Sequence, residues 1–493
     1  MADSIFLLGL CLIPALSSVI TALAPVRGIG KISTVLSGVL FVWALSHWGG
    51  ADRYFSFPWF EALGLRYSLH LDSYSYLLIL LSSLLGLLCS FYASWAVKDK
   101  AKAYHSLFHA LQASIIACLL AEDLLFFYVF FEAMLIPMFF LIGIWGGKNR
   151  LYATMKFFLY TFAGSLFMLI GLLSLYVIYY QQTGEWTASF PVLRDYFSQF
   201  PIAFSTEKWI FLSFVLAFAI KVPLFPFHTW LPDAHTEAPT AGSVILAGIL
   251  LKIGTYGLMR FALPLFPESA MAFATPLCVL SVLGIVVGAI VAWRQVDMKR
   301  LIAYSSVSHL GFVTLGIFSM TEIGWNGAYL QMLSHGITTG ALFFLVGFIY
   351  DQRHSREIEA YGGLAHKAPI FVVFFVVSSL SSVGLPGLNG FVGEFLILLG
   401  SFQSVLVDPF WVVVATTGVI LSAIYTLHLI QKICYGEVKR EAVGVVDFGR
   451  REWLLYSPLV LLMFSIGLYP SWVMDSIYET TSLIFSMMPE AVR

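Results

Sequence analysis

The sequence predicts an all-α polytopic membrane protein with about fourteen transmembrane helices, including two inverted five-helix repeats that each contain a broken helix. Composition is the first observation behind this fold class: 59% of the 493 residues are hydrophobic and 11% are charged, whereas about one quarter of a soluble domain is charged. Apolar runs of about 20 residues, the length that crosses a bilayer, recur along the chain. Proline and glycine interrupt two of these runs.

Polar, glycine-containing or proline-containing segments separate the predicted spans. No basic region precedes the first apolar run and no clear cleavage site follows it, so we expect a first span rather than a cleaved signal peptide. Asp72 precedes the third span and Glu122-Asp123 precede the fifth, where we expect carboxylates to stabilise the helix starts. The spans fall near residues 4–24, 31–48, 76–97, 107–121, 124–145, 152–180, 209–228, 241–263, 273–293, 301–319, 326–350, 369–400, 410–434 and 453–478.

The distribution of basic residues predicts the orientation of these spans. If the N-terminus is outside, alternate loops face the cytoplasm, and these loops hold most of the 27 Lys and Arg residues. Cytoplasmic loops of membrane proteins carry such an excess, so we expect an even number of spans with both chain ends outside. The loops lie near residues 27–31, 98–102, 148–156, 294–300, 353–367 and 432–451.

Two predicted spans are interrupted near their middle. The stretch FVLAFAIKVPLFPFHTWLPDAH contains Pro223, Pro226 and Pro232, and each proline removes a backbone donor and clashes with the preceding turn. The stretch SSVGLPGLNGFVGEFLILL carries glycine and proline clustered at 384–390. Non-helical backbone is tolerated at this depth only where it is buried in protein or lines a hydrated cavity. Broken helices at matching places in two halves indicate an internal repeat with an ion path.

Charged residues align the two halves of the chain. Lys221 and Glu394 lie 173 residues apart, each beside a helix break. A similar offset places Ser305 opposite Glu132, and it places Tyr425 opposite a second lysine at position 252. Two five-span repeats with this alignment have inverted topology, because five is an odd number.

The alignment predicts four segments. We expect N-terminal helices over residues 1–106, a first repeat over 107–263, a second repeat over 264–435 and a C-terminal helix over 436–493.

Four charged residues lie inside predicted spans, where a charge costs about 2.5–3.5 kcal/mol on insertion scales. Glu132 and Lys252 have apolar residues on both sides and lie too far from an interface to reach water easily. Lys221 and Glu394 lie beside the helix breaks, where freed carbonyls and water can reach them. These groups are either structural ion pairs between helices or carriers of protons. Their number, together with several intramembrane histidines, favours proton translocation.

We expect Glu132 to pair with Lys221 and to control its protonation. Burial disfavours the charged form of either group, whereas a nearby opposite charge favours it. A lysine beside a glutamate therefore changes protonation when the glutamate moves away or is neutralised. Lys252 is then expected to pass protons toward the second repeat, and Glu394 to serve the exit. Transfer against a membrane potential costs about 2.3 kcal/mol per charge per 100 mV, so an external energy source is needed.

Five histidines are candidate proton relays. His309 and His335 lie inside spans beside Ser and Thr residues, and histidine titrates near physiological pH. Each could equally be a neutral histidine that satisfies a helix contact. His228 and His235 flank the end of the broken seventh span, and His428 is supported only by the repeat alignment.

Other classes of binding site lack a signal in the sequence. The formal net charge of −1 does not favour nucleic acid or another polyanion, and we find no GxGxxG fingerprint or P-loop. The cysteines stand singly without metal-ligand spacing, so we expect buried thiols and neither a metal site nor disulfides. Membrane lipid is the expected surrounding. The five cysteines are Cys11, Cys89, Cys118, Cys278 and Cys434.

Four long stretches of the chain resemble sequence motifs of one protein family. They are KVPLFPFHTWLPDAHTEAPTAGSVILAGILLKIGTYGLMRF (221–261), FEAMLIPMFFLIGIWG (131–146), LIAYSSVSHLGFV (301–313) and LPGLNGFVGEF (385–395). These stretches resemble the antiporter-like membrane subunits of NADH:quinone oxidoreductase, respiratory complex I. Three features resemble the chain M, or mitochondrial subunit 4, type. They are the glutamate at the second break, the sequence that follows the first break and the short segment after the last span.

The resemblance implies roles, cofactors and partners. It implies that FMN, iron–sulfur clusters and the main quinone site belong to partner subunits, and that this chain holds no redox cofactor although it is part of a proton-translocating oxidoreductase. Expected partners are other membrane-arm subunits of complex I, including homologous antiporter-like chains on either side. The sequence of these motifs favours a bacterial inner membrane over an organellar one. The implied proton-channel residues are Glu132, Lys221, Lys252 and Glu394, connected by His309 and His335.

Three other functions remain open on the sequence alone. A subunit of a multi-subunit Na⁺/H⁺ antiporter would share the fold but differ in coupling, and neighbouring genes for NADH- or quinone-reductase subunits would argue against it. A membrane-bound hydrogenase or formate-linked complex could use a homologous subunit, which its co-purifying partners would reveal. A purely structural scaffold predicts that neutralising the four charges leaves proton pumping unchanged.

Overall fold

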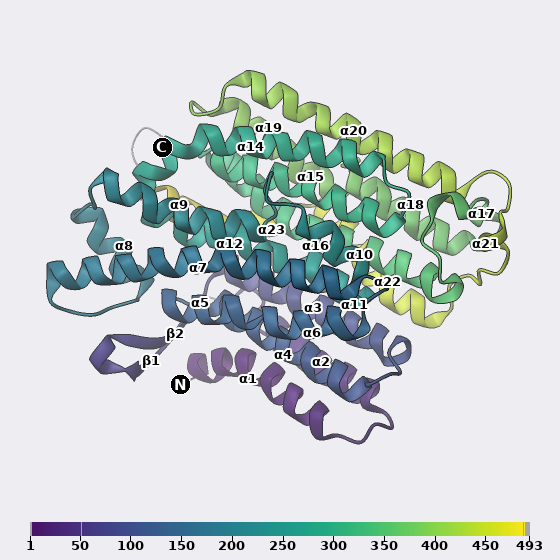
Figure 1. The fold of residues 1–493 in the computed structure, drawn as a ribbon, viewed down its shortest axis with the longest axis horizontal. Coiled ribbons are helices and arrows are strands. Elements are labelled where there is room, and N and C mark those ends of the chain that lie inside the picture. Colours follow the sequence, from purple (N-terminus) through teal and green to yellow (C-terminus); the bar gives the residue numbers. More distant parts are fainter. Residues whose placement is uncertain (1, 51, 487, 489–493) are drawn as a thin grey trace. The chain divides into compact units, whose positions relative to one another are not determined.

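The chain forms two compact units in the computed structural model, which describes residues 2–50, 52–486 and 488 (Figure 1). Unit 1 comprises the described residues of Met1–Val222, Ile249–Phe273 and Ser482–Arg493, and unit 2 comprises Pro223–Gly248 and Ala274–Thr481. The chain passes from unit 1 to unit 2 at the first helix break. The division into two five-helix repeats stays a prediction.

Unit 1 is a bundle of helices with one β-hairpin at its edge. Helix α4 packs against α1, α3, α5 and α6, while α7 packs against α9. Its helices are α1 (Ala2–Leu23), α2 (Ile29–Leu45), α3 (Ser73–Ala96), α4 (Ala101–Leu120), α5 (Leu124–Ala133), α6 (Leu135–Trp145), α7 (Arg150–Thr183), α8 (Phe190–Gln199), α9 (Phe204–Lys221), α12 (Leu251–Gly257) and α13 (Leu263–Leu265).

Unit 2 is built around α16, which packs against α15, α18, α19 and α22. Helix α14 begins in unit 1 and continues into unit 2, and α23 ends in unit 1. The helices are α10 (Trp230–Glu237), α11 (Thr240–Ile245), α14 (Pro267–Trp293), α15 (Met298–Phe318), α16 (Glu322–Arg353), α17 (Leu364–Lys367), α18 (Pro369–Val383), α19 (Asn389–Gln403), α20 (Pro409–Cys434), α21 (Arg440–Val443), α22 (Arg450–Leu468) and α23 (Ser471–Ser486).

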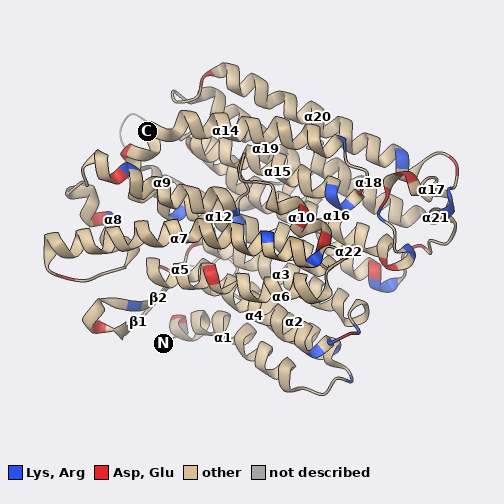
Figure 2. Ribbon diagram, in the orientation of Figure 1, with Lys and Arg blue, Asp and Glu red and all other residues tan. Residues whose placement is uncertain are grey.

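The helices confirm a polytopic membrane fold. Among the described residues, 11 helices are long and apolar enough to cross a membrane. The other three predicted spans correspond to the shorter α2 and to the broken pairs α9–α10 and α18–α19. Figure 2 shows that charged residues lie mostly at helix ends and in connections, leaving long uncharged stretches within the helices.

Both predicted helix breaks are present. Helix α9 ends at Lys221 and α10 begins at Trp230, while α18 ends at Val383 and α19 begins at Asn389. At the second break Gly384 has a φ of 82°, a left-handed conformation that glycine adopts without strain. Proline and glycine therefore end the helices where the sequence predicted.

The last predicted span is wrong in its C-terminal boundary. Residues 453–478 were expected to form one helix, but α22 ends at Leu468 and α23 begins at Ser471. Pro470 lies between them, and proline does not continue a helix from the preceding residue.

A β-hairpin adds to the all-α prediction. Strand β1 (Arg53–Phe60) pairs antiparallel with β2 (Leu65–Leu71), and Tyr54 lies opposite His70. Aromatic residues recur in β1 (RYFSFPWF), and apolar and polar residues alternate in β2 (LRYSLHL), two patterns that favour strands. The sequence carried this signal, but the hairpin was not predicted because its strands are too short to form a long apolar run.

Carboxylates cap the helix starts as expected. Asp72 accepts a hydrogen bond from the Ser75 backbone N–H at 2.9 Å at the start of α3. Asp123 accepts from the N–H groups of Leu125 and Phe126 at 3.0 and 3.1 Å at the start of α5. Each cap satisfies backbone donors that the helix itself leaves unpaired.

Candidate functional site

Glu132 lies at a discontinuity in the fifth span. Helix α5 ends one residue after it, and α6 begins at Leu135. Pro137 has no N–H for the carbonyl one turn back, which explains why the helix does not continue regularly here. Its carboxylate is within hydrogen-bonding reach of Ser165 from α7, and Tyr128 one turn earlier neighbours the same serine. The sequence contained this proline signal, but the prediction treated the span as continuous.

Lys221 is the last residue of α9 and is buried. Its Nζ lies 4.9 Å from the centre of the Phe131 ring, a cation–π contact that stabilises an ammonium group. Glu132 and Cys118 are its electrostatic neighbours.

The predicted Glu132–Lys221 pair is therefore an electrostatic interaction without a direct hydrogen bond. Within the described part of the chain, Lys221 Nζ makes no hydrogen bond, and neither does Glu132 Oε1. The ammonium group faces the ring of Phe131 instead. Proton exchange between the two side chains needs a bridging hydroxyl or water.

Lys252 is fully buried in α12 between two π-helical segments, Leu246–Leu250 and Leu258–Ala262. Such segments are rare and occur frequently at functional sites. Close packing holds α12 against α9, since a Cβ added at Gly254 would lie 3.1 Å from the Lys221 Cβ. The sequence placed Lys252 in mid-span, but a helical pattern does not distinguish π from α backbone.

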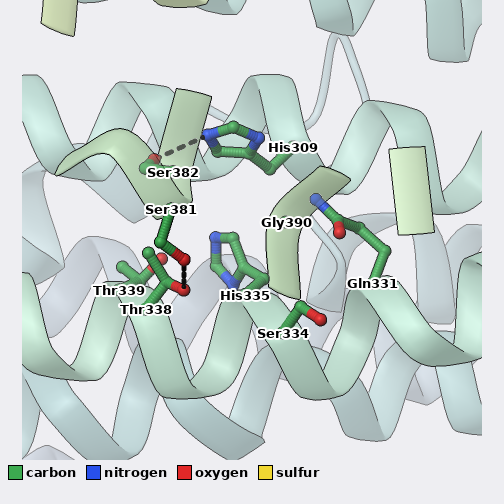
Figure 3. Close-up of a pocket in the computed structure, with 9 residues that line it drawn as sticks. All are labelled: His309, Gln331, Ser334, His335, Thr338, Thr339, Ser381, Ser382 and Gly390. Atoms are coloured by element: carbon green, nitrogen blue, oxygen red, sulfur yellow. Dashed lines mark hydrogen bonds between the residues drawn. The ribbon is translucent and has the colours of Figure 1, made fainter. Parts of the chain in front are cut away.

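Glu394 in unit 2 belongs to a direct hydrogen-bonded cluster. Its Oε1 lies 2.9 Å from His309 Nδ1 and accepts a hydrogen bond from Gln331 Nε2 at 3.0 Å. The other ring nitrogen of His309 lies 3.1 Å from Ser382 Oγ, and Figure 3 marks this hydrogen bond with a dashed line. Helices α15, α16, α18 and α19 each supply one of these side chains. The imidazole thus connects a carboxylate to a hydroxyl at the second helix break.

A second set of hydrogen bonds lies beside this cluster at the break. Thr338 and Ser381 hydroxyls lie 2.7 Å apart (Figure 3), and Ser381 donates to Asn389 Oδ1. The His335 ring lies 5.8 Å from the His309 ring, between centres. Both histidine rings and both hydroxyl groups face a small pocket. Its lining residues are His309, Gln331, Ser334, His335, Thr338, Thr339, Ser381, Ser382 and Gly390.

Glycines permit the close approach of α19 to its neighbours. A Cβ added at Gly390 would lie 2.1 Å from the Ser381 carbonyl oxygen, and one at Gly393 would lie 2.6 Å from Gln331 Oε1. These distances leave no room for a side chain. Gly390 was noted in the sequence as a helix breaker and Gly393 was not, and the role of both in packing depends on the neighbouring helices.

The remaining histidines lie in different surroundings. His235 is buried and stacks on Phe343, with ring centres 4.8 Å apart. His228 is half-buried and stacks on Phe225 at 5.5 Å. His428 is exposed on α20, so the structure does not bring it into the Glu394 cluster.

Tyr425, rather than His428, faces the cluster from α20. Its hydroxyl lies 3.2 Å from Ser422 Oγ and within hydrogen-bonding reach of Ser305, and Glu394 is an electrostatic neighbour. The repeat alignment singled out both Ser305 and Tyr425, but polar uncharged residues were not chosen as site residues. Gln331, Ser382 and Asn389 were also missed, because a single polar residue in a span carries no distinctive sequence signal.

Comparison with known proteins places these sites in a family. The family model described as NADH:quinone oxidoreductase/Mrp antiporter, TM, matches residues 121–424. The chain belongs to this family. The match extends over the broken helices and all four charged residues, and it confirms the resemblance found in the sequence.

Named relatives and a solved structure give the same result. The chain is 46% identical over 419 residues to NADH-quinone oxidoreductase subunit M of Rhodobacter capsulatus, covering 84% of this chain and 81% of the relative. It is 39% identical over 488 residues to NADH-ubiquinone oxidoreductase chain 4 of Marchantia polymorpha, covering 96% of each. A chain of respiratory complex I from Thermus thermophilus with bound NADH superposes with a TM-score of 0.89 at 32% identity, covering 98% of this chain and 100% of that chain.

Proposed function

We propose that this chain is a proton-translocating, antiporter-like subunit in the membrane arm of a bacterial NADH:quinone oxidoreductase. Its role is to couple electron transfer from NADH to quinone to proton movement across the inner membrane. Family membership and the named relatives support the proposal. The observation that carries it is the buried 2.9 Å contact between His309 and Glu394, since imidazole and carboxylate are suited to exchanging protons near neutral pH.

In unit 2, His309 acts as a two-sided relay. A neutral imidazole accepts a proton on one ring nitrogen and releases one from the other. A proton entering at Nε2 from the Ser382 side is thus balanced by a proton leaving Nδ1 for Glu394 Oε1. Gln331 donates to the same oxygen and holds the carboxylate in position for the transfer.

In unit 1, Glu132 controls the charge of Lys221. When Glu132 takes up a proton, the ammonium group loses the opposite charge that stabilised it and releases its own proton. The contact with the Phe131 ring favours the charged form before that step. Lys252 is the next carrier, and its flanking π-helical segments provide backbone that departs from the regular α-helical pattern.

The proposed partners supply the energy and the redox chemistry. We propose that this chain lies beside other membrane-arm subunits, including homologous antiporter-like chains. FMN, the iron–sulfur clusters and the main quinone site belong to partner subunits in this scheme, and this chain itself carries only protons.

The test uses the complete complex that contains this chain, purified with its subunits identified and reconstituted in liposomes. We expect Glu132→Gln and Glu394→Gln to abolish or greatly reduce NADH-driven proton uptake while the complex assembles and still reduces quinone. Glu437→Gln, the same chemical change at an exposed position, is the matched control. Full pumping by both the Glu132 and the Glu394 variants would refute the proposal, and transport of Na⁺ in place of protons would favour a subunit of a multi-subunit Na⁺/H⁺ antiporter.

A further inference from the structure

Helix α4 carries a line of polar side chains that the proposed proton path does not use. His105, His109 and Gln112 are spaced by four and three residues, so they lie on one face of the helix over about two turns. Each is at most 1% exposed. The line begins one turn inside α4, after the basic loop 98–102 that the sequence places on the cytoplasmic side.

These three side chains lack protein partners for several of their polar atoms. Over the described ranges of the chain, both ring nitrogens of His105 make no hydrogen bond. Nδ1 of His109 and both amide atoms of Gln112 also make no hydrogen bond of good geometry within these ranges, although the two side chains lie within hydrogen-bonding reach of each other. Buried polar atoms in native proteins are almost always satisfied by protein or by ordered water. Unsatisfied atoms at three successive positions on one face therefore point to a polar ligand held against that face.

Helix α2 presents hydroxyl groups toward the same region. Ser33 Oγ lies 2.9 Å from His109 Nε2. One turn further along α2, Ser37 Oγ lies 2.8 Å from the hydroxyl of Ser90 on α3. All of these groups are buried, so α2, α3 and α4 share a polar interface inside unit 1.

Helix α3 leaves space for this interface. A Cβ at Gly86 would lie 1.4 Å from Gln112 Nε2, so only glycine admits the amide at this position. Ser82, one turn away on α3, has a buried hydroxyl that makes no hydrogen bond within the described part of the chain. Gln112 on α4 thus packs directly against Gly86 of α3, one turn from Ser82.

We propose that α2, α3 and α4 hold a column of water that conducts protons from the cytoplasmic side into unit 1. This α4 column is bordered by His105, His109, Gln112, Ser33 and Ser90. Water suits these groups because it both donates and accepts, and buried waters typically make about three hydrogen bonds to such atoms. The assignment of protons as the conducted species rests on the proposed function.

The inner end of the column leads toward Lys221. Cys118 lies six residues beyond Gln112 on α4, about 9 Å along the helix axis, and it is an electrostatic neighbour of Lys221. In this proposal the α4 column carries protons toward the part of unit 1 that holds Lys221. It enters unit 1 through the N-terminal helices.

The proposal is tested with His109→Leu and Gln112→Leu in the reconstituted complex, beside His109→Gln. We expect each Leu variant to slow NADH-driven proton uptake by about tenfold, because an apolar side chain displaces the water that carries the proton. His109→Gln retains hydrogen bonding at similar size and should keep most of the rate. Ser114→Ala is the control on α4, because its hydroxyl bonds to the carbonyl of Ala110 in its own helix at 3.0 Å.

A second measurement does not depend on activity. A high-resolution cryo-EM map of the assembled complex should contain ordered water between α2, α3 and α4 in the wild type and lose it in Gln112→Leu. Equal proton uptake by the His109 Leu and Gln variants, or an interface without water, would overturn the inference. Normal pumping by Glu394→Gln would instead indicate failure of the proposed function, and the water density would still decide whether the column exists.

Discussion

In unit 2, the Glu394 carboxylate is held by two direct contacts of 2.9 and 3.0 Å from His309 and Gln331. In unit 1, the Lys221 ammonium lies over an aromatic ring and makes no hydrogen bond within the described part of the chain. A buried network of direct hydrogen bonds favours one arrangement, whereas a charge held without hydrogen bonds is sensitive to every change in nearby charge. In the proposed function, unit 2 is therefore suited to proton transfer along fixed hydrogen bonds, and unit 1 to a response to changes in nearby charge.

The largest effect is expected from Lys221→Met. This change removes the titrating group, so NADH-driven proton uptake should fall to background. Thermal stability of the complex should not fall, because Met fills a similar volume and Lys221 Nζ makes no hydrogen bond to any described residue. Proton uptake in liposomes and thermal unfolding followed by tryptophan fluorescence measure the two effects. A clear loss of stability would show that Lys221 is held as firmly as Glu394, and the comparison between the units would fail.

Glu394→Ala should lose both pumping and stability. Removal of the carboxylate leaves His309 Nδ1 and Gln331 Nε2 without their acceptor, and an unsatisfied buried donor costs about 1–3 kcal/mol. Glu394→Gln retains an oxygen acceptor and should lose pumping with a smaller loss of stability. The two variants are compared by unfolding of the purified complex in detergent. Identical stability of the Ala variant and the wild type would contradict the view of a tightly held cluster.

The smallest effect is expected from His428→Leu. The side chain is exposed on α20, and substitutions away from buried features usually change stability by no more than about 0.5 kcal/mol. Proton uptake and thermal stability should match the wild type. His309→Leu serves as the contrasting variant, because His309 bridges Glu394 and Ser382. Loss of pumping in His428→Leu alone would restore the relay role that the repeat alignment suggested.

The main features of the fold were predictable because they depend on local chemistry. Long apolar runs predicted the helices, and proline and glycine predicted both breaks at Lys221 and after Val383. The hairpin Arg53–Leu71 was missed because its alternating pattern is short. The interruption in the fifth span was missed although Pro137 is present in the sequence, since a proline in a span can be accommodated without a break.

The candidate site was predictable only in part. Charges inside apolar spans are rare enough to be recognised, so Glu132, Lys221, Lys252 and Glu394 were found from the sequence. Their hydrogen-bond partners were not found, because Gln331 is ordinary in any single helix and acquires its role only from its neighbour.

The sequence by itself determined the membrane class, the two helix breaks, the four charges inside the spans and the family. Each of these depends on residue type and order, because burial cost and backbone restriction act on the residue itself. Only the tertiary structure decided that Glu394 bonds to His309 while Lys221 faces Phe131. It also decided that His428 points outward and that polar side chains from α2, α3 and α4 meet. Those results depend on which faces of separate helices come together, and helix packing is set by the shape of many side chains at once.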